Sequence, residues 1–352
     1  MDAQRLDFLL NHFPQVRVAV VGDFFLDRYL VIDPALREVS LETGLEAYQV
    51  VAQRSSPGAA GTVTSNLRAL GVGRVLAVSI LGRDGNGYDL RQGLAATGVE
   101  LDYLIEAPDR FTPTYTKPMQ RQPDGSEVEM NRLDIKNRQP LPADLEEALL
   151  ERLRAVVPRV HGVLIADQVP ERNCGVITDR VREEIAALAL AYPEVLFLAD
   201  SRRRIGEFRH VALKPNHREA VEAIRPGFSG VGDRAAAEEA GRQLSARNGR
   251  PVFVTLGPEG MLVCTPTGCE RVPAIPVRGP IDIVGAGDSA FASIAAALCS
   301  GATPREAALL GNLVASLTIQ QLGTTGTATP DQVRERFARW SAGTLVESSL
   351  YQ

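Results

Sequence analysis

Lysine is scarce in this 352-residue chain. Only three of its 38 basic residues are lysines, Lys117, Lys136 and Lys214, so arginine carries nearly all of the positive charge. The formal net charge is −5, which argues against a general nucleic-acid-binding protein. We therefore expect no nucleic-acid partner.

Cysteine is also infrequent. The four cysteines include no C-x-x-C pair, and no histidine lies at metal-ligand spacing from them. A metal site built on cysteine is therefore not expected. We predict that all four are buried thiols in a reducing compartment: Cys174, Cys264, Cys269 and Cys299.

Several targeting and nucleotide-binding signals are missing. The N-terminus has no basic region followed by an apolar region, and no apolar run approaches membrane-spanning length. We therefore expect a cytoplasmic protein with no membrane partner. No G-x-x-x-x-G-K-[ST] sequence occurs, which excludes a P-loop kinase.

The remaining pattern alternates apolar strands with amphipathic helices. This alternation predicts an α/β fold with a mostly parallel central sheet covered by helices on both faces. The predicted strands cover residues 16–21, 75–80, 162–166, 195–199, 211–213 and 252–256, followed by a hairpin within 260–277. The main predicted helices cover residues 3–13, 142–156, 173–191, 217–224, 233–247, 304–321 and 330–342.

Two polar, strand-like segments interrupt the alternation, at about 29–55 and 112–134. The second contains Pro123-Asp124-Gly125, a hairpin-turn sequence. We expect both segments to form one small β-sheet, a lid that stands off the core. The prediction is thus a single domain over 1–342 with this lid, followed by a tail at 343–352.

The most informative stretch is 281–301, IDIVGAGDSAFASIAAALCSG. Gly285-Ala286-Gly287 turns the chain tightly, and the helix that follows adds unpaired amides and the positive end of its dipole. Together they predict a cradle for an anion such as phosphate. Asp288 repels an anion unless it acts chemically, as a base that takes a proton from a hydroxyl. The alternative is that Asp288 only caps the helix.

Other strand ends carry candidate ligands with equally simple alternatives. Asn216 and Glu219 can face phosphate and the water shell of a magnesium ion, or form a helix capping box. The sequence 255–260, TLGPEG, can let a base or phosphate approach the backbone, or make a plain hairpin turn. Asp23 and Asp27 follow the first strand, at the carboxyl end where α/β sheets bind their ligands. Alternatively, one of them only caps a turn.

Taken together, these motifs resemble the ribokinase-like (PfkB) carbohydrate kinase family over about 16–333. The signature D-x-x-G-A-G-D is complete at 282–288, and N-x-x-E occurs at 216–219. T-x-G-x-x-G occurs at 255–260, and Asn312 precedes a Leu-Gly-Thr-Thr loop at 322–325. The sequence GDFFLDRY at 22–29 looks most like the heptose-7-phosphate kinase part of ADP-heptose synthase.

The resemblance implies a ribokinase-like three-layer fold and ATP-dependent phosphoryl transfer to a sugar or sugar phosphate. It implies ATP as co-substrate, Mg²⁺ held by Glu219 through water, and a homodimer formed through the lid. Whether a monovalent cation is also needed is left open by the resemblance. The implied catalytic residues are the base Asp288 and the anion hole Gly285, Ala286 and Gly287. The implied ATP-binding residues are Asn216, Glu219, Thr255, Gly257, Gly260 and Asn312. The implied substrate-binding residues are Asp23, Asp27, Gly58, Ala59, Lys117 and Arg132.

The chain departs from the family pattern around the sugar. Ala59 replaces the second glycine of a Gly-Gly pair, and Thr62 replaces an asparagine. The heptose kinases carry a tyrosine and a lysine after the fifth strand, where this chain has Asp167-Gln168, and Asp-Pro-Lys where it has Asp200-Ser201-Arg202. The arginines of 202–204 could replace lysine as a phosphate grip. The chain leaves no length for the nucleotidyltransferase half of bifunctional heptose enzymes.

Two other classes of function compete with a kinase. Thr62 and Ala59 suggest a kinase-fold module that binds nucleotide or sugar without turnover. This hypothesis does not explain why Asp288 would stand in an anion cradle. A Rossmann dehydrogenase needs a third glycine or alanine and a later acidic residue, which Gly285-Ala286-Gly287 does not supply.

Overall fold

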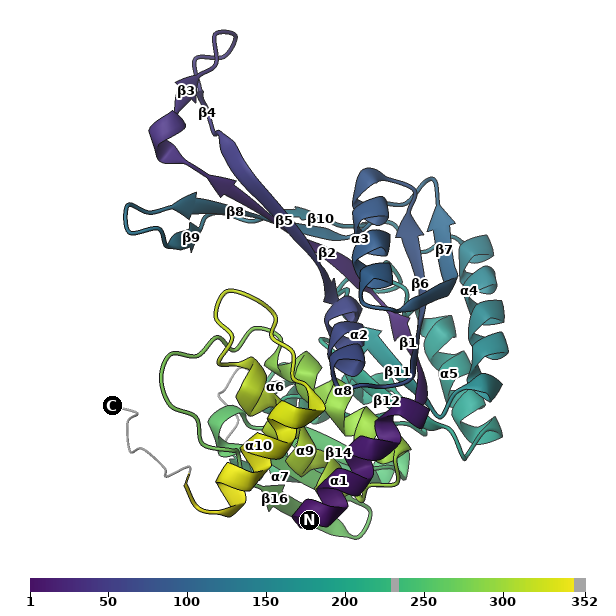
Figure 1. Cartoon of the computed structure of the whole chain (residues 1–352). Coiled ribbons are helices and arrows are strands. Elements are labelled where there is room, and N and C mark those ends of the chain that lie inside the picture. Colours follow the sequence, from purple (N-terminus) through teal and green to yellow (C-terminus); the bar gives the residue numbers. More distant parts are fainter. Residues whose placement is uncertain (229–233, 345–352) are drawn as a thin grey trace.

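The central sheet has nine strands in the order β16-β15-β14-β13-β12-β11-β1-β6-β7 (Figure 1). The computed structural model describes residues 1–228 and 234–344. The strands are β1 Arg17–Gly22, β6 Arg74–Gly82, β7 Glu100–Ala107, β11 Gly162–Asp167, β12 Leu196–Ser201, β13 Ala212–Leu213, β14 Val252–Thr255, β15 Met261–Thr265 and β16 Gly268–Val272. All neighbours pair in parallel except β14–β15 and β15–β16, which confirms the mostly parallel sheet.

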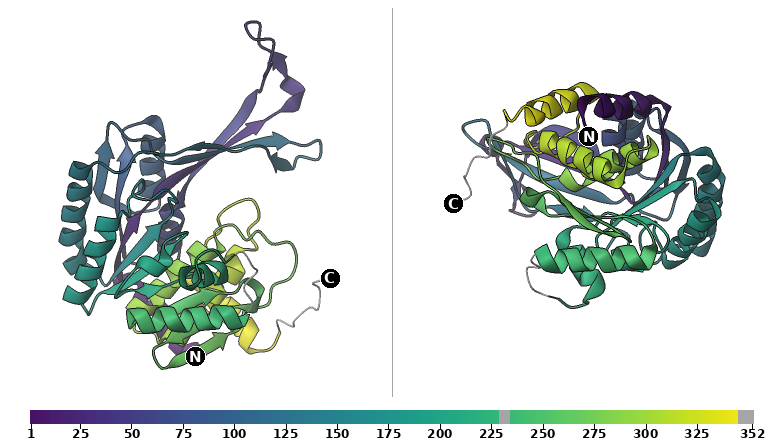
Figure 2. Two further views of the ribbon diagram at one scale, coloured as in Figure 1. Left: turned by 180° about the vertical axis from the view of Figure 1, so that it is seen from behind. Right: turned by 90° about the horizontal axis from the view of Figure 1, so that it is seen from below.

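Helices cover both faces of this sheet (Figure 2). One face packs against α1 Ala3–His12, α2 Ala60–Ala69, α3 Gly85–Ala96, α8 Ala286–Cys299, α9 Pro304–Thr318 and α10 Pro330–Ser341. The other packs against α4 Ala143–Val156, α5 Asp179–Ala191, α6 His217–Ile224 and α7 Arg234–Asn248. Strand β1 serves both cores, because alternate side chains of a strand point to opposite faces: Val18 and Val20 join one, Ala19 and Val21 the other.

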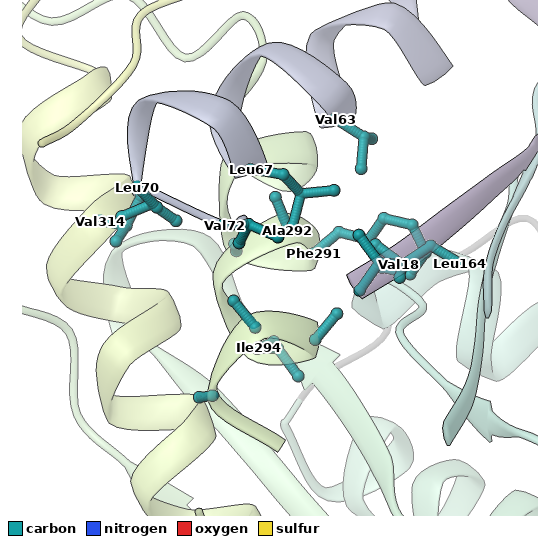
Figure 3. Close-up of a cluster of buried hydrophobic side chains, with 14 of the residues drawn as sticks. Val18, Val63, Leu67, Leu70, Val72, Leu164, Phe291, Ala292, Ile294 and Val314 are labelled. Carbon is teal, nitrogen blue, oxygen red and sulfur yellow. The ribbon is translucent and has the colours of Figure 1, made fainter. Parts of the chain in front are cut away.

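Helix α8 lies inside the first core, between α2 and α9 (Figure 3). Its many alanines let neighbouring helices approach closely, while Phe291 fills the space next to Val18 and Leu164. Burying a side chain such as Phe291 contributes roughly 2 kcal/mol relative to exposure. This packing fixes the N-terminus of α8 at the carboxyl edge of the central sheet.

A second sheet stands away from the core (Figure 1). Its strands run in the order β10-β8-β2-β5, with β9 beside β8. They are β2 Phe24–Ile32, β5 Val50–Ala59, β8 Thr114–Arg121, β9 Glu127–Glu129 and β10 Leu133–Ile135. The short pair β3 Glu38–Val39 and β4 Glu46–Ala47 extends from its far end. The two predicted lid segments therefore do form one sheet, since β2 pairs with both β5 and β8.

Some predicted boundaries were wrong. The first lid segment, expected to end at about residue 55, runs further: β5 continues to Ala59, pairs with β2 over that length and leads directly into α2. The helix expected from residue 173 begins at Asp179, because Asn173 adopts a positive φ of 62° and Thr178 caps the helix. Strand β7 was not predicted; as an edge strand it is only partly buried and lacks a continuous apolar run.

Short 3₁₀ turns complete the described chain. They are η1 Phe13–Gln15, η2 Pro34–Leu36, η3 Val157–Arg159, η4 Ile205–Glu207 and η5 Gly257–Glu259. Of the predicted tail at 343–352, residues 345–352 lie outside the described residues. Within the described ranges, none of the helices has the length and apolar character needed to cross a bilayer.

The prediction of four free thiols was wrong for two of them. Cys264 and Cys269 form a disulfide, because the β15–β16 register places them opposite each other with Cα atoms 4.0 Å apart. Their five-residue separation does not reveal this pairing until the hairpin register is known. Cys174 and Cys299 are free, and burial raises the pKa of the Cys299 thiol to about 12.

Candidate active site at the carboxyl edge of the central sheet

The predicted anion cradle lies at the first turn of α8. Gly285 is the N-cap residue, with a φ of 80° and no side-chain cap, and Ala286 and Gly287 open the helix. The Ala286 amide donates to the Ile283 carbonyl (3.2 Å), and helix geometry leaves the next amides without intrahelical partners. Asp288 is the third residue of the helix, so the alternative that Asp288 is its cap was wrong.

The carboxylate of Asp288 lies in a strongly charged environment. Burial, and then the nearby Asp200, raise its pKa to about 7, while Lys214 and Arg202 oppose the shift. Burial and Asp200 also raise the pKa of Glu219 to about 7. Three carboxylates from β12, α6 and α8 thus meet at one edge of the sheet. A group with a pKa near 7 can exchange a proton at neutral pH.

Lys214 lies among these carboxylates and was not singled out from the sequence. Its side chain is buried, and Nζ lies 3.1 Å from Asp200 Oδ2 and 3.7 Å from the ideal Cβ position at Gly287. Burial opposes its charge, but Asp200 and Glu219 hold its pKa above the usual value. Two features of the sequence could have identified it as a site residue. It is one of only three lysines, and it lies two residues before Asn216.

Asn216 and Glu219 form the capping box that the sequence left as an alternative. Asn216 Oδ1 accepts from the Glu219 amide (2.9 Å), and Glu219 Oε2 accepts from the Asn216 amide (2.8 Å). The same turn bridges to Thr255, whose amide donates to the Pro215 carbonyl (3.0 Å). The structure therefore brings the N-x-x-E turn and the 255–260 loop together.

The 255–260 loop turns on two glycines. Gly257 and Gly260 have φ values of 60° and 94°, and a Cβ on Gly260 would lie 2.3 Å from the Val272 carbonyl oxygen. Asn312 Nδ2 donates to the carbonyls of Val272 (3.1 Å) and Pro273 (2.9 Å). Its side-chain nitrogen therefore holds the end of β16 beside this loop.

Asp27 marks the second half of the site, on β2. Its carboxylate is buried next to Gly58, where a Cβ would lie 2.8 Å from Asp27 Oδ2. Burial raises the pKa of Asp27, and Lys117 opposes the shift with Nζ 3.8 Å from Oδ1. Lys117 also donates to the Tyr29 hydroxyl (3.2 Å). Gly58 is thus the residue that leaves room for this carboxylate.

Two other predicted substrate-binding residues are held by the protein itself. Asp23 accepts backbone N–H groups of Gln168, Val169 and Val176 at 2.7–3.0 Å. Arg132 pairs with both carboxylate oxygens of Asp134 (2.6 and 2.9 Å). The carboxylate of Asp23 and the guanidinium of Arg132 therefore already have hydrogen-bond partners within the described chain.

Ala59 has a strained backbone. It adopts a φ of 52° and a ψ of −118° at the junction of β5 and α2. This conformation favours glycine, the residue that the family pattern carries there.

The family described as pfkB family carbohydrate kinase matches residues 18–332. The chain belongs to this family. The matched range includes residues 285–288, the N-x-x-E turn, the 255–260 loop and β2.

Relatives within the pfkB family include bifunctional HldE proteins. The HldE of Geotalea uraniireducens is 29% identical over 340 residues, which cover 95% of this chain and 65% of that protein. The HldE of Caulobacter sp. strain K31 is 32% identical over 323 residues, which cover 89% of this chain and 61% of that protein. The chain thus spans less than two thirds of the length of these relatives.

Solved structures of the family share the fold. Phosphofructokinase-2 from Escherichia coli, in complex with potassium, superposes with a TM-score of 0.70 at 19% identity and covers 93% of this chain and 99% of that chain. Ribokinase from Arabidopsis thaliana, complexed with ribose and ATP, gives 0.64 at 19% identity, with 91% and 98% covered. The ribokinase-like three-layer fold is therefore confirmed.

The side chains suit a magnesium ion that keeps waters and phosphate ligands. Across residues 1–228 and 234–344, no three His, Cys, Asp or Glu side chains form a group that could hold a metal. Asp200 and Glu219 nevertheless supply carboxylate oxygens beside the cradle. Mg²⁺ dehydrates reluctantly and is commonly bound by one or two carboxylates together with substrate phosphates.

Proposed function

We propose that this protein transfers the γ-phosphoryl group of ATP to a hydroxyl of a sugar or sugar phosphate, with Asp288 as the general base. The observation that carries the proposal is a carboxylate with a pKa of about 7 in the first turn of α8, beside open backbone amides and the buried Lys214. A base needs a pKa near the working pH, and an anion needs preorganised donors. Both are present within one helical turn.

In the proposed reaction, Asp288 accepts the proton of the acceptor hydroxyl. The hydroxyl oxygen forms a bond to the γ-phosphorus while the bond from that phosphorus to the β–γ bridging oxygen breaks, and ADP leaves. The anion hole of Gly285, Ala286 and Gly287 and the ammonium of Lys214 stabilise the equatorial oxygens of the migrating group.

The ATP phosphates belong next to the N-x-x-E turn in this proposal. Glu219 and Asp200 would hold Mg²⁺ through its water shell, and the bound ion would neutralise charge on the phosphates. Asn216 faces the same phosphates, while Thr255, Gly257 and Gly260 border the nucleotide. A monovalent cation is proposed only by analogy with the potassium complex of phosphofructokinase-2.

The acceptor lies on the side of β2. Asp27, beside Lys117 and Gly58, is placed to accept hydrogen bonds from hydroxyl groups. Ala59 and Arg132 border the same region, and Asp23 shapes it by holding the 168–176 loop. We also propose that the second sheet forms a homodimer contact, because it exposes apolar side chains on several strands.

A coupled assay of ADP release tests the function. Wild-type protein is incubated with Mg·ATP and a panel of sugars and sugar phosphates, and ADP formed without an acceptor is subtracted. We expect at least one acceptor to give a rate well above this background. Tight ATP binding with no turnover on any acceptor would instead favour a silent binding module.

A further inference from the structure

The three consecutive arginines that follow β12 have three different environments. Arg204 is buried and pairs with Asp167, Nη2 to Oδ1 at 2.9 Å. Arg203 is mostly exposed and lies 3.9 Å from Glu222 at the surface. Arg204 is therefore held by Asp167, and Arg203 has its carboxylate partner at the surface.

Arg202 differs from its neighbours because its charge is not matched. Its Nε donates to the neutral Gln168 Oε1 (2.7 Å), and within the described ranges its guanidinium has no ion pair. Its charge nevertheless reaches the active site, where it lowers the pKa values of Asp27, Glu219 and Asp288 against the larger effect of burial. Among the described residues its two terminal nitrogens have no hydrogen-bond acceptor, so they are open to a ligand near these three carboxylates.

Gln168 is itself held rigidly. Its amide donates to Asp23 Oδ2 (2.8 Å), and Asp23 also accepts from the amides of Val169 (3.0 Å) and Val176 (2.7 Å). The Arg202 amide donates to the Asp167 carbonyl (3.2 Å), which ties the two loops together. The side chain of Gln168 therefore aims the guanidinium from a fixed loop.

Gln168 stands where the heptose-kinase pattern has the tyrosine after β11, Arg202 stands where it has the lysine after β12, and the two side chains contact each other. We propose that Arg202, aimed by Gln168, binds a phosphate group in the active site and that the Gln168–Arg202 pair determines which acceptor is used. The proposal rests on the proposed phosphoryl transfer for its location. Guanidinium matches phosphate because its planar donors can form two parallel hydrogen bonds.

The phosphate has two possible sources, the migrating group of ATP or a phosphate already on the acceptor. Calorimetric titration separates them without knowledge of the acceptor. The first arm compares binding of Mg·AMP-PNP with Mg·ADP, which lacks the γ-phosphate. The second arm measures binding of inorganic phosphate to protein saturated with Mg·AMP-PNP, whose γ-site is already filled.

The variants are Arg202→Met, Arg202→Lys and Gln168→Glu, with Arg203→Met as the matched control. Arg202→Met should weaken binding roughly 10- to 100-fold in one arm, as expected for loss of a charged hydrogen bond. Arg202→Lys should recover part of it. Gln168→Glu is isosteric and should weaken the same arm, because its carboxylate captures the guanidinium. Arg203→Met should match the wild type.

Loss in the first arm assigns the migrating phosphoryl group, and loss in the second assigns an acceptor phosphate; either supports the proposal. Folded Arg202→Met protein that stays within twofold of the wild type in both arms would overturn it. So would a wild-type protein in which neither arm detects a phosphate contribution. These binding measurements need no turnover, so they stand apart from the ADP-release assay that tests the function.

Discussion

The ionised form of the Asp288 carboxyl group is disfavoured by most of its surroundings. Burial and Asp200 favour its neutral form, whereas Lys214 and Arg202 favour the ionised form. The balance leaves a carboxyl group whose pKa lies near neutrality, in place of the fully ionised carboxylate of an exposed aspartate. The same balance acts on Glu219, so the site as a whole responds to pH in the neutral range.

We expect kcat/KM to rise with pH up to about 7 and then level. The base must be ionised to accept a proton, and the pKa of Asp288 is about 7, so activity is lost as pH falls through that value. The measurement is a pH–rate profile between pH 5.5 and 9 with the best acceptor. Glu219→Gln should keep this acidic limb; a profile that is flat down to pH 5.5 would contradict the role of Asp288.

The same pKa predicts a stability effect that needs no substrate. The pKa of Asp288 is raised from 3.8 in the folded protein, so ionisation costs stability as pH rises from about 4 through 7. Asp288→Asn removes this cost. Its melting temperature should therefore exceed that of the wild type by more at pH 8.5 than at pH 5, where only part of the cost is present.

Sequence motifs located the cradle, the N-x-x-E turn and the 255–260 loop, because each is a short local pattern. They did not reveal Lys214 or the pairing of Gln168 with Arg202, since these depend on which strand ends become neighbours in the sheet. Asp23 illustrates the converse. Its place in the sequence predicts a carboxylate that binds substrate. The structure shows that this carboxylate accepts hydrogen bonds from three backbone amides of the 168–176 loop.

The junction of β5 and α2 stores backbone strain at Ala59. We expect Ala59→Gly to stabilise the protein by about 1 kcal/mol, because glycine adopts a positive φ without a Cβ clash. Equilibrium unfolding in denaturant measures the change.

The matched control is the next residue. Ala60 is fully buried in the first turn of α2, so Ala60→Gly should destabilise the protein by roughly 0.5–1 kcal/mol. A variant Ala59→Gly that is no more stable than the wild type would show that the conformation carries no strain.

Helices and strands were predicted correctly where the apolar residues follow a strong pattern. They were missed where contacts with distant parts of the chain decide the local structure. The buried strands β1, β11 and β12 have apolar runs that identify them directly. Strand β7 lies at a sheet edge, and the start of α5 depends on a left-handed Asn173, so neither has a local signature. The Cys264–Cys269 disulfide follows from hairpin register, which spacing alone does not fix.

The whole molecule exposes apolar side chains mainly on the second sheet and its β3–β4 extension. Leu41, Val128 and Leu133 are 99%, 54% and 62% exposed. Exposed apolar surface of this kind marks protein–protein contacts. Its position on a sheet that stands off the core suits a contact with a second copy of the chain.

We therefore expect the wild-type protein to have twice the 38.0 kDa mass of the chain by light scattering after size exclusion. Leu133→Glu combined with Val128→Glu should shift it toward a monomer. Leu190→Glu, at an equally exposed position on α5, is the control and should leave the mass unchanged. A monomeric wild type at micromolar concentration would contradict the dimer proposal.

The central claim is that Asp288 removes the proton from the acceptor hydroxyl, and Asp288→Asn tests it most directly. The variant preserves shape and the backbone cradle, so its dissociation constant for Mg·AMP-PNP should stay within about threefold of the wild type. Phosphoryl transfer to the best acceptor should fall by 10²–10⁴-fold or more, as expected for loss of a general base. Near-normal turnover by this variant would contradict the account.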